Sequence, residues 1–219
     1  MIDKSKPEDI ENNVLDLLAK IENTARKKFL PSIGPVKGKI LQDITNEHKP
    51  MNVLEIGTLH GYSAILIAHC ILIQKSQYSN DDGDNNSIEP IVISVEKDRK
   101  LAEIARRNIE FLKLSNKIHV IDGDALQVIP NIKSRFSMVF LDATKNEYLK
   151  YLRLIEKQNL LNKGAVVVAD NVIIYENEMK DYLDYVRNSG NYISHTTETT
   201  LEFTKNVKDA LEVSVNVVV

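Results

Sequence analysis

Short apolar runs alternate with longer segments of helical period from residue 50 onward. Five runs are rich in Val and Ile and too short for buried helices, so they are predicted to be strands; they lie at 52–56, 91–95, 117–121, 137–141 and 165–169. Their near-continuous apolarity is typical of strands covered on both faces, as in a parallel sheet. Helical period follows each of four of them, at 62–73, 99–114, 147–159 and 177–188. This alternation predicts a doubly wound α/β domain.

The two ends of the chain depart from this repeat. Residues 1–47 predict an N-terminal helical cap, with helices at 8–28 and 37–47. Two strand-like runs near the other end, 192–197 and 211–219, are joined by only about a dozen residues, so we expect an antiparallel last pair. The apolar final run is expected to be a buried strand of the sheet, not an edge offered to a partner. We therefore expect one domain over 1–219 with a mostly parallel, seven-stranded sheet.

A hydrophilic stretch at 75–89 interrupts the first crossover and predicts a polar surface loop with no chemistry of its own. No apolar run approaches the roughly 20 residues that span a bilayer, and the first residues lack the apolar core of a signal peptide. These features predict a cytoplasmic protein with no membrane association.

Charge and cysteine content narrow the function classes. The net charge of −3 argues against a strongly basic nucleic-acid clamp, although it does not exclude a small RNA substrate. The single cysteine, Cys70, excludes an internal disulfide and a zinc site built from cysteines.

A glycine-containing loop follows the first predicted strand and opens a helix, with the sequence LEIGTLHGYS at 54–63. Gly57 can adopt backbone shapes closed to other residues and lets a ligand approach. Gly61 and Ser63 fall at the helix start, where free N–H groups favour an anion such as a carboxylate. The spacing differs from the dinucleotide fingerprint, because position 59 is not glycine, which indicates a smaller nucleoside ligand. A tight turn that needs glycine is the alternative.

Acidic residues follow the second and third strands. Glu96 ends the second strand, where a carboxylate can accept hydrogen bonds from both hydroxyls of a ribose. Gly123, Asp124 and Ala125 follow the third strand, beside the expected place of an adenine-sized group. Taken singly, Glu96 is also compatible with a solvated strand end, and the DGD sequence with an ordinary turn.

The fourth and fifth strands end in a possible cation site. Asp142 follows the fourth strand, and Asp170 and Asn171 follow the fifth, so neighbouring strands bring three oxygen donors to one edge. Two carboxylates and an amide suit a hard cation, with Mg²⁺ preferred over Ca²⁺ or Mn²⁺. The alternative is that Asp170 and Asn171 cap the next helix. Lys145 lies three residues beyond Asp142, where a bound cation would lower its pKa and make a neutral amine available as a base; an exposed surface lysine is the alternative.

Five segments together resemble the catechol O-methyltransferase family, the cation-dependent enzymes that use S-adenosylmethionine. The resemblance runs from about residue 29 to the C-terminus, and its segments are VKGKIL at 36–41, the loop at 55–63, FLDATKNEY at 140–148, LLNKGAVVVADNV at 160–172 and TLEFTKNVKDALE at 200–212. The pairing of FLD-x-x-K-x-x-Y with a later K-G-x-x-x-x-x-D-N is specific to this family. The resemblance implies the Rossmann-like fold of class I methyltransferases.

By the same resemblance, Asp142, Asp170 and Asn171 bind magnesium, Lys145 is the general base, and Glu202 binds the second hydroxyl of the substrate. The implied S-adenosylmethionine-binding residues are Ile33, Glu55, Gly57, Gly61, Tyr62, Ser63, Glu96, Gly123, Asp124, Ala125 and Asp142. The implied reaction is methyl transfer to one hydroxyl of a small catechol-like substrate by a monomer or homodimer.

Several departures from the family pattern bear on the substrate. The chain has no tryptophan, Phe29 and Thr144 stand at positions of the substrate wall, and Tyr175 replaces a proline. The acceptor is therefore expected to differ from catechol itself. Three other functions remain open: a tRNA hydroxyuridine O-methyltransferase of the same fold, an NAD-dependent oxidoreductase, and a non-catalytic nucleoside-binding module.

Overall fold

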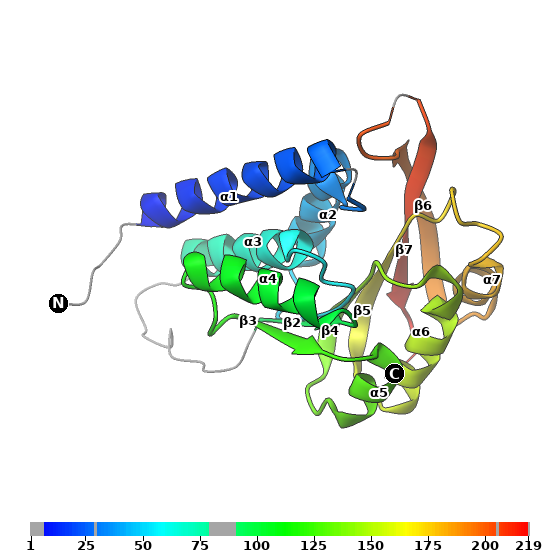
Figure 1. Cartoon of the computed structure of the whole chain (residues 1–219). Helices are drawn as coiled ribbons and strands as arrows, with labels where there is room; N and C mark the ends of the chain where they lie inside the picture. Colours follow the sequence, from blue (N-terminus) through cyan, green and yellow to red (C-terminus); the bar gives the residue numbers. More distant parts are fainter. Residues whose placement is uncertain (1–6, 29, 79–90, 205, 219) are drawn as a thin grey trace.

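The computed structural model describes residues 7–28, 30–78, 91–204 and 206–218 (Figure 1). The strands are β1 (Val53–Ile56), β2 (Val92–Glu96), β3 (Ile118–Asp122), β4 (Phe136–Leu141), β5 (Leu161–Asp170), β6 (Tyr192–Thr200) and β7 (Lys208–Asn216). The α-helices are α1 (Pro7–Lys28), α2 (Gly34–His48), α3 (Tyr62–Tyr78), α4 (Arg99–Phe111), α5 (Ala125–Val128), α6 (Tyr148–Lys157) and α7 (Lys180–Asn188). Two 3₁₀ turns, η1 (Ile129–Asn131) and η2 (Lys145–Glu147), complete the set among the described residues.

The seven strands form one sheet in the order β3-β2-β1-β4-β5-β7-β6. Strands β1 to β5 are parallel, and β7 runs antiparallel to both β5 and β6. The strand order reverses at β1, which pairs with β2 on one side and β4 on the other. In a sheet of this kind, ligands bind beyond the carboxyl ends of the strands at that reversal. The expected fold class is confirmed, including the antiparallel last pair.

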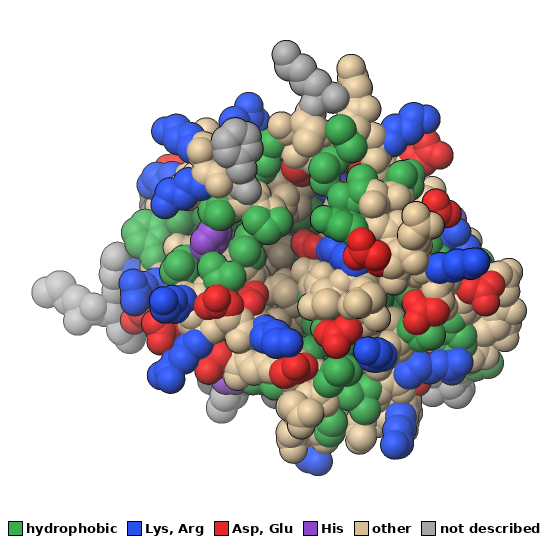
Figure 2. Space-filling model, turned by 45° about the vertical axis from the view of Figure 1, so that its right-hand side comes forward, with side chains coloured by type: hydrophobic (Ala, Val, Ile, Leu, Met, Phe, Trp, Pro, Cys, Tyr) green, Lys and Arg blue, Asp and Glu red, His purple; other side chains and the backbone are tan. Residues whose placement is uncertain are grey.

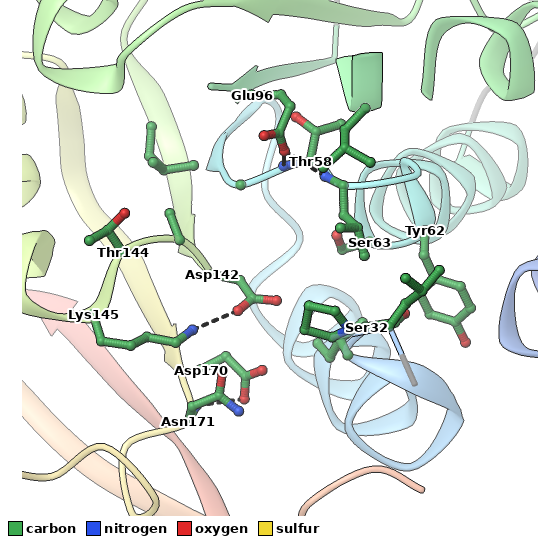
Figure 3. A pocket seen from close by; sticks show the side chains of 18 of the residues that line it. Ser32, Thr58, Tyr62, Ser63, Glu96, Asp142, Thr144, Lys145, Asp170 and Asn171 are labelled. Carbon is green, nitrogen blue, oxygen red and sulfur yellow. Dashed lines mark hydrogen bonds and ion pairs between the residues drawn. The ribbon is translucent and has the colours of Figure 1, made fainter. Parts of the chain in front are cut away.

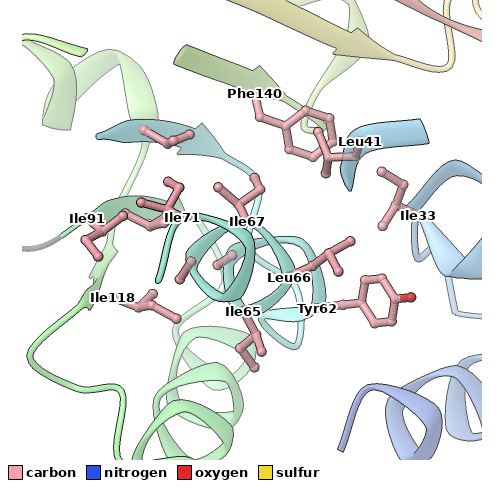
Figure 4. Close-up of a cluster of buried hydrophobic side chains, with 14 of the residues drawn as sticks. Ile33, Leu41, Tyr62, Ile65, Leu66, Ile67, Ile71, Ile91, Ile118 and Phe140 are labelled. Atoms are coloured by element: carbon pink, nitrogen blue, oxygen red, sulfur yellow. The ribbon is translucent and has the colours of Figure 1, made fainter. Parts of the chain in front are cut away.

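Alternate residues of the central strands enter two separate cores. Met138 and Phe140 of β4 point to the face covered by α1 to α4, and Val139 and Leu141 point to the face covered by α5 to α7. Figure 4 shows part of the first core, in which Phe140 and Leu41 of α2 lie side by side. Because both faces are covered, every second residue of a strand must be apolar on each side, which gives the continuous apolar runs of the sequence.

The predicted boundaries differ from the observed ones where polar residues form strand ladders. Strand β6 extends to Thr200 and β7 begins at Lys208, because Thr199 pairs with Asp209 and Thr200 with Lys208 in the antiparallel ladder. A ladder uses backbone groups only, so the polar side chains of this segment conceal it from a hydrophobicity pattern. Similarly, β5 begins at Leu161, opposite Phe136, four residues before the predicted start. Strand β7 lies between β5 and β6, so the prediction of a buried final strand is confirmed.

The short helix α5 was not predicted from the hydrophobic pattern. It contains four residues, too few to show a helical period, and it begins where the Asp124 carboxylate accepts the backbone N–H of Leu126 at 2.9 Å. The predicted polar loop at 75–89 is partly helical, because α3 continues to Tyr78. The rest of that loop, residues 1–6 and Phe29 lie outside the described residues.

The N-terminal helices cover the sheet face next to the glycine loop. In α2, Leu41, Ile44 and Thr45 are buried, and the Tyr62 hydroxyl of α3 donates a hydrogen bond of 2.6 Å to Glu22 of α1. Over the described residues, the structure contains no helix that is long and apolar enough to cross a membrane. Cytoplasmic location and oligomeric state stay predictions.

Leu41 tests how far the helical cap stabilises the domain. The side chain is 0% exposed within the first core, so Leu41→Ala should lower the free energy of unfolding by about 2–5 kcal/mol through lost burial and a residual cavity. The matched control is Leu15→Ala on α1, where 54% of the residue is exposed, and the change should stay within about 0.5 kcal/mol. Urea unfolding followed by circular dichroism measures the free energy of unfolding of both variants. If Leu41→Ala lowered it no more than Leu15→Ala does, the packing of the cap would contribute little to stability.

Candidate active site

A cavity of about 580 Å³ opens beyond the carboxyl ends of the parallel strands. Figure 2 shows the hollow in the middle of this face, with acidic and basic side chains inside it and hydrophobic side chains beside it. Its volume is typical of a small-molecule site. The predicted site residues on its wall are Ile33, Gly57, Tyr62, Ser63, Glu96, Gly123, Asp124, Ala125, Asp142, Lys145, Asp170, Asn171 and Glu202.

Gly57 allows the loop after β1 to meet the end of β4. Its φ of +99° is unfavourable for residues with a side chain, and a Cβ atom here would lie 2.1 Å from the backbone oxygen of Asp142. The sequence suggested that this glycine leaves room for a ligand. In the structure, the close neighbour is the chain's own backbone, so Gly57 brings the glycine loop and Asp142 to one wall.

Glu96 organises the glycine loop from the end of β2. Its Oε2 atom accepts the backbone N–H groups of Thr58 at 3.1 Å and Leu59 at 2.8 Å (Figure 3). Its Oε1 atom accepts the backbone N–H of Asp98 at 2.9 Å. A carboxylate has about four acceptor positions, so these three bonds leave about one for a ligand's hydroxyl group. Leu59 has a φ of +49° at the position where the dinucleotide fingerprint has glycine.

Glu55 and Gly61 are the predicted binding residues that do not line the cavity. Glu55 is 0% exposed beneath the loop, where its Oε2 atom accepts the hydroxyl of Ser94. Burial raises the pKa of Glu55 to about 7, and the nearby hydroxyls of Ser63 and Ser94 counter part of that rise. Gly61 packs against Ala105 of α4, with a φ of +84°. Both residues therefore support the loop from behind.

Lys145 lies against Asp142 on the opposite side of the cavity. Its ammonium group donates to Asp142 Oδ1 at 2.8 Å (Figure 3). It also donates to the Tyr148 hydroxyl at 2.9 Å. Burial is the largest single effect and lowers the pKa of Lys145, but Asp142, Tyr148 and Asp170 together outweigh it, so the pKa is raised overall. In this arrangement the amine is charged, whereas the sequence analysis expected a lowered pKa in the presence of a cation.

Asp170 and Asn171 lie beside this pair at the end of β5 (Figure 3). Burial and the neighbouring Asp142 carboxylate raise the pKa of Asp170, while Lys37 and Lys145 act against the rise. Asn171 has a φ of +67°, a left-handed conformation that asparagine tolerates better than most residues. Two carboxylates that destabilise each other's charge form an environment that a cation would relieve.

The oxygen donors fit a divalent cation in kind and in availability. The hydrogen bonds described for these side chains engage Asp142 Oδ1, Asp170 Oδ1 and the Asn171 amide nitrogen. The second oxygen of both aspartates and the amide oxygen of Asn171 are left as donors to a cation. No group of three or more His, Cys, Asp or Glu side chains suited to a metal occurs in the described ranges. The candidate cation ligands, Asp142, Asp170 and Asn171, carry only two negative charges, because the third ligand is an amide.

Lys37 on this wall and its partner Asp209 were not recognised as site residues from the sequence. Lys37 of α2 is 1% exposed, and its ammonium group donates to Asp170 Oδ1 at 2.7 Å and to Asp209 Oδ2. Burial lowers the pKa of Lys37, but the Asp170 and Asp209 carboxylates together have the larger effect, so the pKa is raised overall. The helical period of the sequence could have indicated that Lys37 is buried. Lys37 precedes the buried residues Leu41 and Ile44 by four and seven positions, which places it on the same face of the helix.

Glu202 lies in the connection between β6 and β7 and reaches the first turn of α2. Its Oε1 atom accepts the backbone N–H of Lys37 at 2.8 Å, and a Cβ on Gly34 would meet the Glu202 side chain at 2.6 Å. Burial raises the pKa of Glu202, although the backbone N–H groups of Lys37 and Val36 act against it. The carboxylate predicted to contact substrate therefore also satisfies the start of a helix.

Comparison with known proteins assigns the family. A family model described as O-methyltransferase matches residues 7–217. The chain belongs to the O-methyltransferase family. Catechol O-methyltransferase B of Danio rerio is 35% identical over 194 residues, which cover 86% of this chain and 67% of that protein. Catechol O-methyltransferase of Bos taurus is 32% identical, covering 85% of this chain and 64% of that protein. The predicted resemblance and the predicted enzyme class are confirmed.

Solved structures of O-methyltransferases share the architecture. The O-methyltransferase from Bacillus cereus, in complex with SAH, has a TM-score of 0.70 and 26% identity, covering 98% of this chain and 93% of that chain. TomG from Streptomyces achromogenes, in complex with SAM, has a TM-score of 0.72 at 22% identity, covering 92% of this chain and 89% of that chain, and supports the fold alone. The chain spans about two thirds of the length of these Danio rerio and Bos taurus relatives.

The buried Glu55 of this O-methyltransferase gives a pH-dependent prediction. Its pKa of about 7 in the folded chain lies above the ordinary 4.5, so the folded state retains a proton that the unfolded state releases. Its contribution to stability is therefore complete below pH 4.5 and lost as the pH rises through 7.

Replacing Glu55 with Gln removes this titration while preserving size. From about pH 5 to about pH 8, the free energy of unfolding of Glu55→Gln should rise by about 2–3 kcal/mol relative to the unchanged protein. Urea unfolding of both proteins at each pH measures the difference, in which other titrating groups cancel. A difference independent of pH would contradict the assignment.

Proposed function

We propose that this protein transfers the methyl group of S-adenosylmethionine to one hydroxyl of a small catechol-like substrate with two adjacent hydroxyls. The observation that carries the proposal is the grouping of Asp142, Asp170, Asn171 and Lys145 on one wall, next to the glycine loop (Figure 3). Family membership supports the reaction class, and the names of the vertebrate relatives support the catechol-like acceptor.

The cofactor is proposed to lie along the carboxyl ends of β1, β2 and β3. The helix start at Ser63 favours the carboxylate of the methionine end, with the backbone at Ile33 and Gly57 beside it. Glu96 is proposed to bind the ribose hydroxyls. The short segment from Gly123 to Ala125 then forms the adenine end. Tyr62 completes the wall towards α3, and the SAH complex of the Bacillus cereus relative supports this use of the cavity.

A divalent cation is proposed to bind Asp142, Asp170 and Asn171, with Mg²⁺ preferred because these donors are hard oxygens. When bound, such an ion polarises the substrate oxygens and lowers the pKa of the attacking hydroxyl. Asp142, Asp170 and Asn171 also fix where the two substrate oxygens must lie relative to the cofactor. Positioning of this kind supplies a large part of the rate in a displacement reaction.

Lys145 is proposed to accept the proton of the attacking hydroxyl. Burial alone lowers its pKa, and the Asp142 charge is the first of the effects that raise it. Neutralising that carboxylate therefore shifts the amine towards its neutral, basic form. Glu202 is proposed to accept the second hydroxyl through Oε2, while its Oε1 atom is held by the backbone of Lys37.

The outer wall of the cavity supports the proposal that the acceptor differs from catechol itself. Ile174, Leu201 and Phe203 form apolar surface, and Tyr175 is 38% exposed at the mouth. The Lys145 ammonium lies 5.9 Å from the centre of the Tyr175 ring, so this aromatic side chain borders the reacting position. We propose an acceptor whose ring or chain packs against Tyr175 and Phe203.

Methyl transfer from labelled S-adenosylmethionine to a panel of vicinal diphenols tests the reaction. Transfer should occur with Mg²⁺, should cease with EDTA and should return when Mg²⁺ is restored in excess, while monophenols of the same size react poorly because they lack the second oxygen. Transfer that EDTA does not change would contradict the role of the cation. Binding of S-adenosylmethionine without transfer to any diphenol would favour a tRNA base, tested with tRNA in the same assay.

Lys145→Ala tests the proposed base. Turnover should fall by about 10²- to 10⁴-fold, the usual contribution of a general base, while calorimetry should show S-adenosylmethionine affinity within about twofold of the original. Lys150→Ala is the matched control, because Lys150 is exposed on the neighbouring helix α6 and does not line the cavity. Full activity of Lys145→Ala would show that another group accepts the proton.

A further inference from the structure

Lys37 joins the helical cap to the candidate cation site through its side chain. The ammonium group contacts Asp170 of β5 at 2.7 Å and Asp209 of β7, and all three side chains are no more than 3% exposed. Burying charges in this way costs free energy unless each is paired and hydrogen-bonded. Well-packed apolar side chains would fill the same space at lower cost, so the arrangement calls for a role beyond stability.

Asp209 extends the contact to Asn171. Its Oδ2 atom accepts the Asn171 amide nitrogen at 2.8 Å, in addition to the Lys37 ammonium. Since an acidic oxygen can only accept, this bond decides which end of the amide is nitrogen, and the Asn171 oxygen must point elsewhere. That oxygen is the atom by which Asn171 would hold a cation. Asp209 Oδ1 also accepts the backbone N–H groups of Ile173 and Ile174 at 3.4 Å, which places the segment after Asn171.

The backbone of Lys37 contacts a further carboxylate, that of Glu202. Its N–H donates to Glu202 Oε1 at 2.8 Å, while its side chain holds Asp170. A single residue of α2 therefore sets the position of one proposed cation ligand and of the proposed substrate carboxylate. No other described contact joins these two carboxylates through one residue.

We propose that Lys37 and Asp209 are positioning residues that hold Asp170 and the amide oxygen of Asn171 in the orientation that binds the cation. This inference rests on the proposed function, because it assumes that the cation binds there. Outer partners of this kind typically change metal affinity by about 10- to 100-fold when removed. Neither residue donates an atom to the cation itself.

Charge and positioning make opposite predictions for Lys37→Met, which is what makes the test decisive. Removing a positive charge beside the site should strengthen cation binding by Coulomb attraction alone. Loss of positioning should weaken it, because Asp170 and Asp209 lose the group that holds them in place. The structural alternative, in which Lys37 only fastens α2 to the sheet, predicts no weakening in a protein that remains folded.

The experiment is a titration of the full chain with Mn²⁺, in which electron paramagnetic resonance measures the free ion. Lys37→Met should bind Mn²⁺ about 10- to 100-fold more weakly than the unchanged protein, with S-adenosylmethionine affinity unchanged as evidence of folding. Lys39→Met is the matched control: Lys39 is two residues away on the same helix, its side chain is 65% exposed, and it forms an ion pair with Asp43, away from the site. Its Mn²⁺ affinity should not change.

The double variant Lys37→Met with Asp209→Asn covers the case in which the single variant does not fold. It removes one positive and one negative charge together, so the net charge near the site is unchanged and only the positioning contacts are lost. It should also bind Mn²⁺ at least tenfold more weakly. Unchanged or tighter binding by either folded variant would overturn the inference. Failure of the unchanged protein to bind Mn²⁺ would instead overturn the proposed cation site on which the inference rests.

Discussion

The approach of the glycine loop to the end of β4 is the constraint on which the site depends. The backbone oxygen of Asp142 occupies space that a Cβ on residue 57 would need, so the two segments meet only because Gly57 has no side chain. Asp142 N–H in turn donates to the Ile56 carbonyl at 2.9 Å, and Gly57 N–H donates to the Val95 carbonyl at 2.9 Å. The backbone hydrogen bonding of the sheet thus continues one residue beyond Ile56, the last residue of β1. The proposed cofactor wall and the proposed cation wall become neighbours as a result.

Buried carboxylates support this loop from two directions. Glu96 holds the backbone N–H groups of Thr58 and Leu59 on the cavity side, and Glu55 lies behind the loop with Ser94. A loop without regular secondary structure must have its backbone donors satisfied by something, and a side-chain carboxylate at a strand end does this without blocking the cavity. The same residue, Glu96, is then available for a ligand. Organisation of the loop and ligand binding are therefore not alternatives at this position.

Most of the architecture followed from the hydrophobic pattern because the central strands are buried on both faces. The residues at the strand ends, from Glu96 to Asn171, could be grouped in advance because parallel strands place their carboxyl ends on one edge. The role of Lys37 could not be derived in this way. Its partners, Asp170 and Asp209, are 133 and 172 positions away in the chain, and no local pattern reports such pairings. The position of α5 was missed for a different reason, because four residues are too few to display a period.

The charges of the site show how the cavity tolerates so many carboxylates. Asp142 and Asp170 face each other's charge, and a lysine approaches each of them from a different side, Lys145 from η2 and Lys37 from α2. These two lysines differ in what else they contact. Lys37 has a second carboxylate, Asp209, and its side chain is 1% exposed, whereas Lys145 has the Tyr148 hydroxyl and its side chain is 13% exposed. An ammonium held by two buried carboxylates keeps its proton, which suits a residue that positions others. Lys145 is ion-paired with one carboxylate, Asp142, which makes the largest contribution to its raised pKa, so loss of that charge would favour the neutral amine that the proposed base requires.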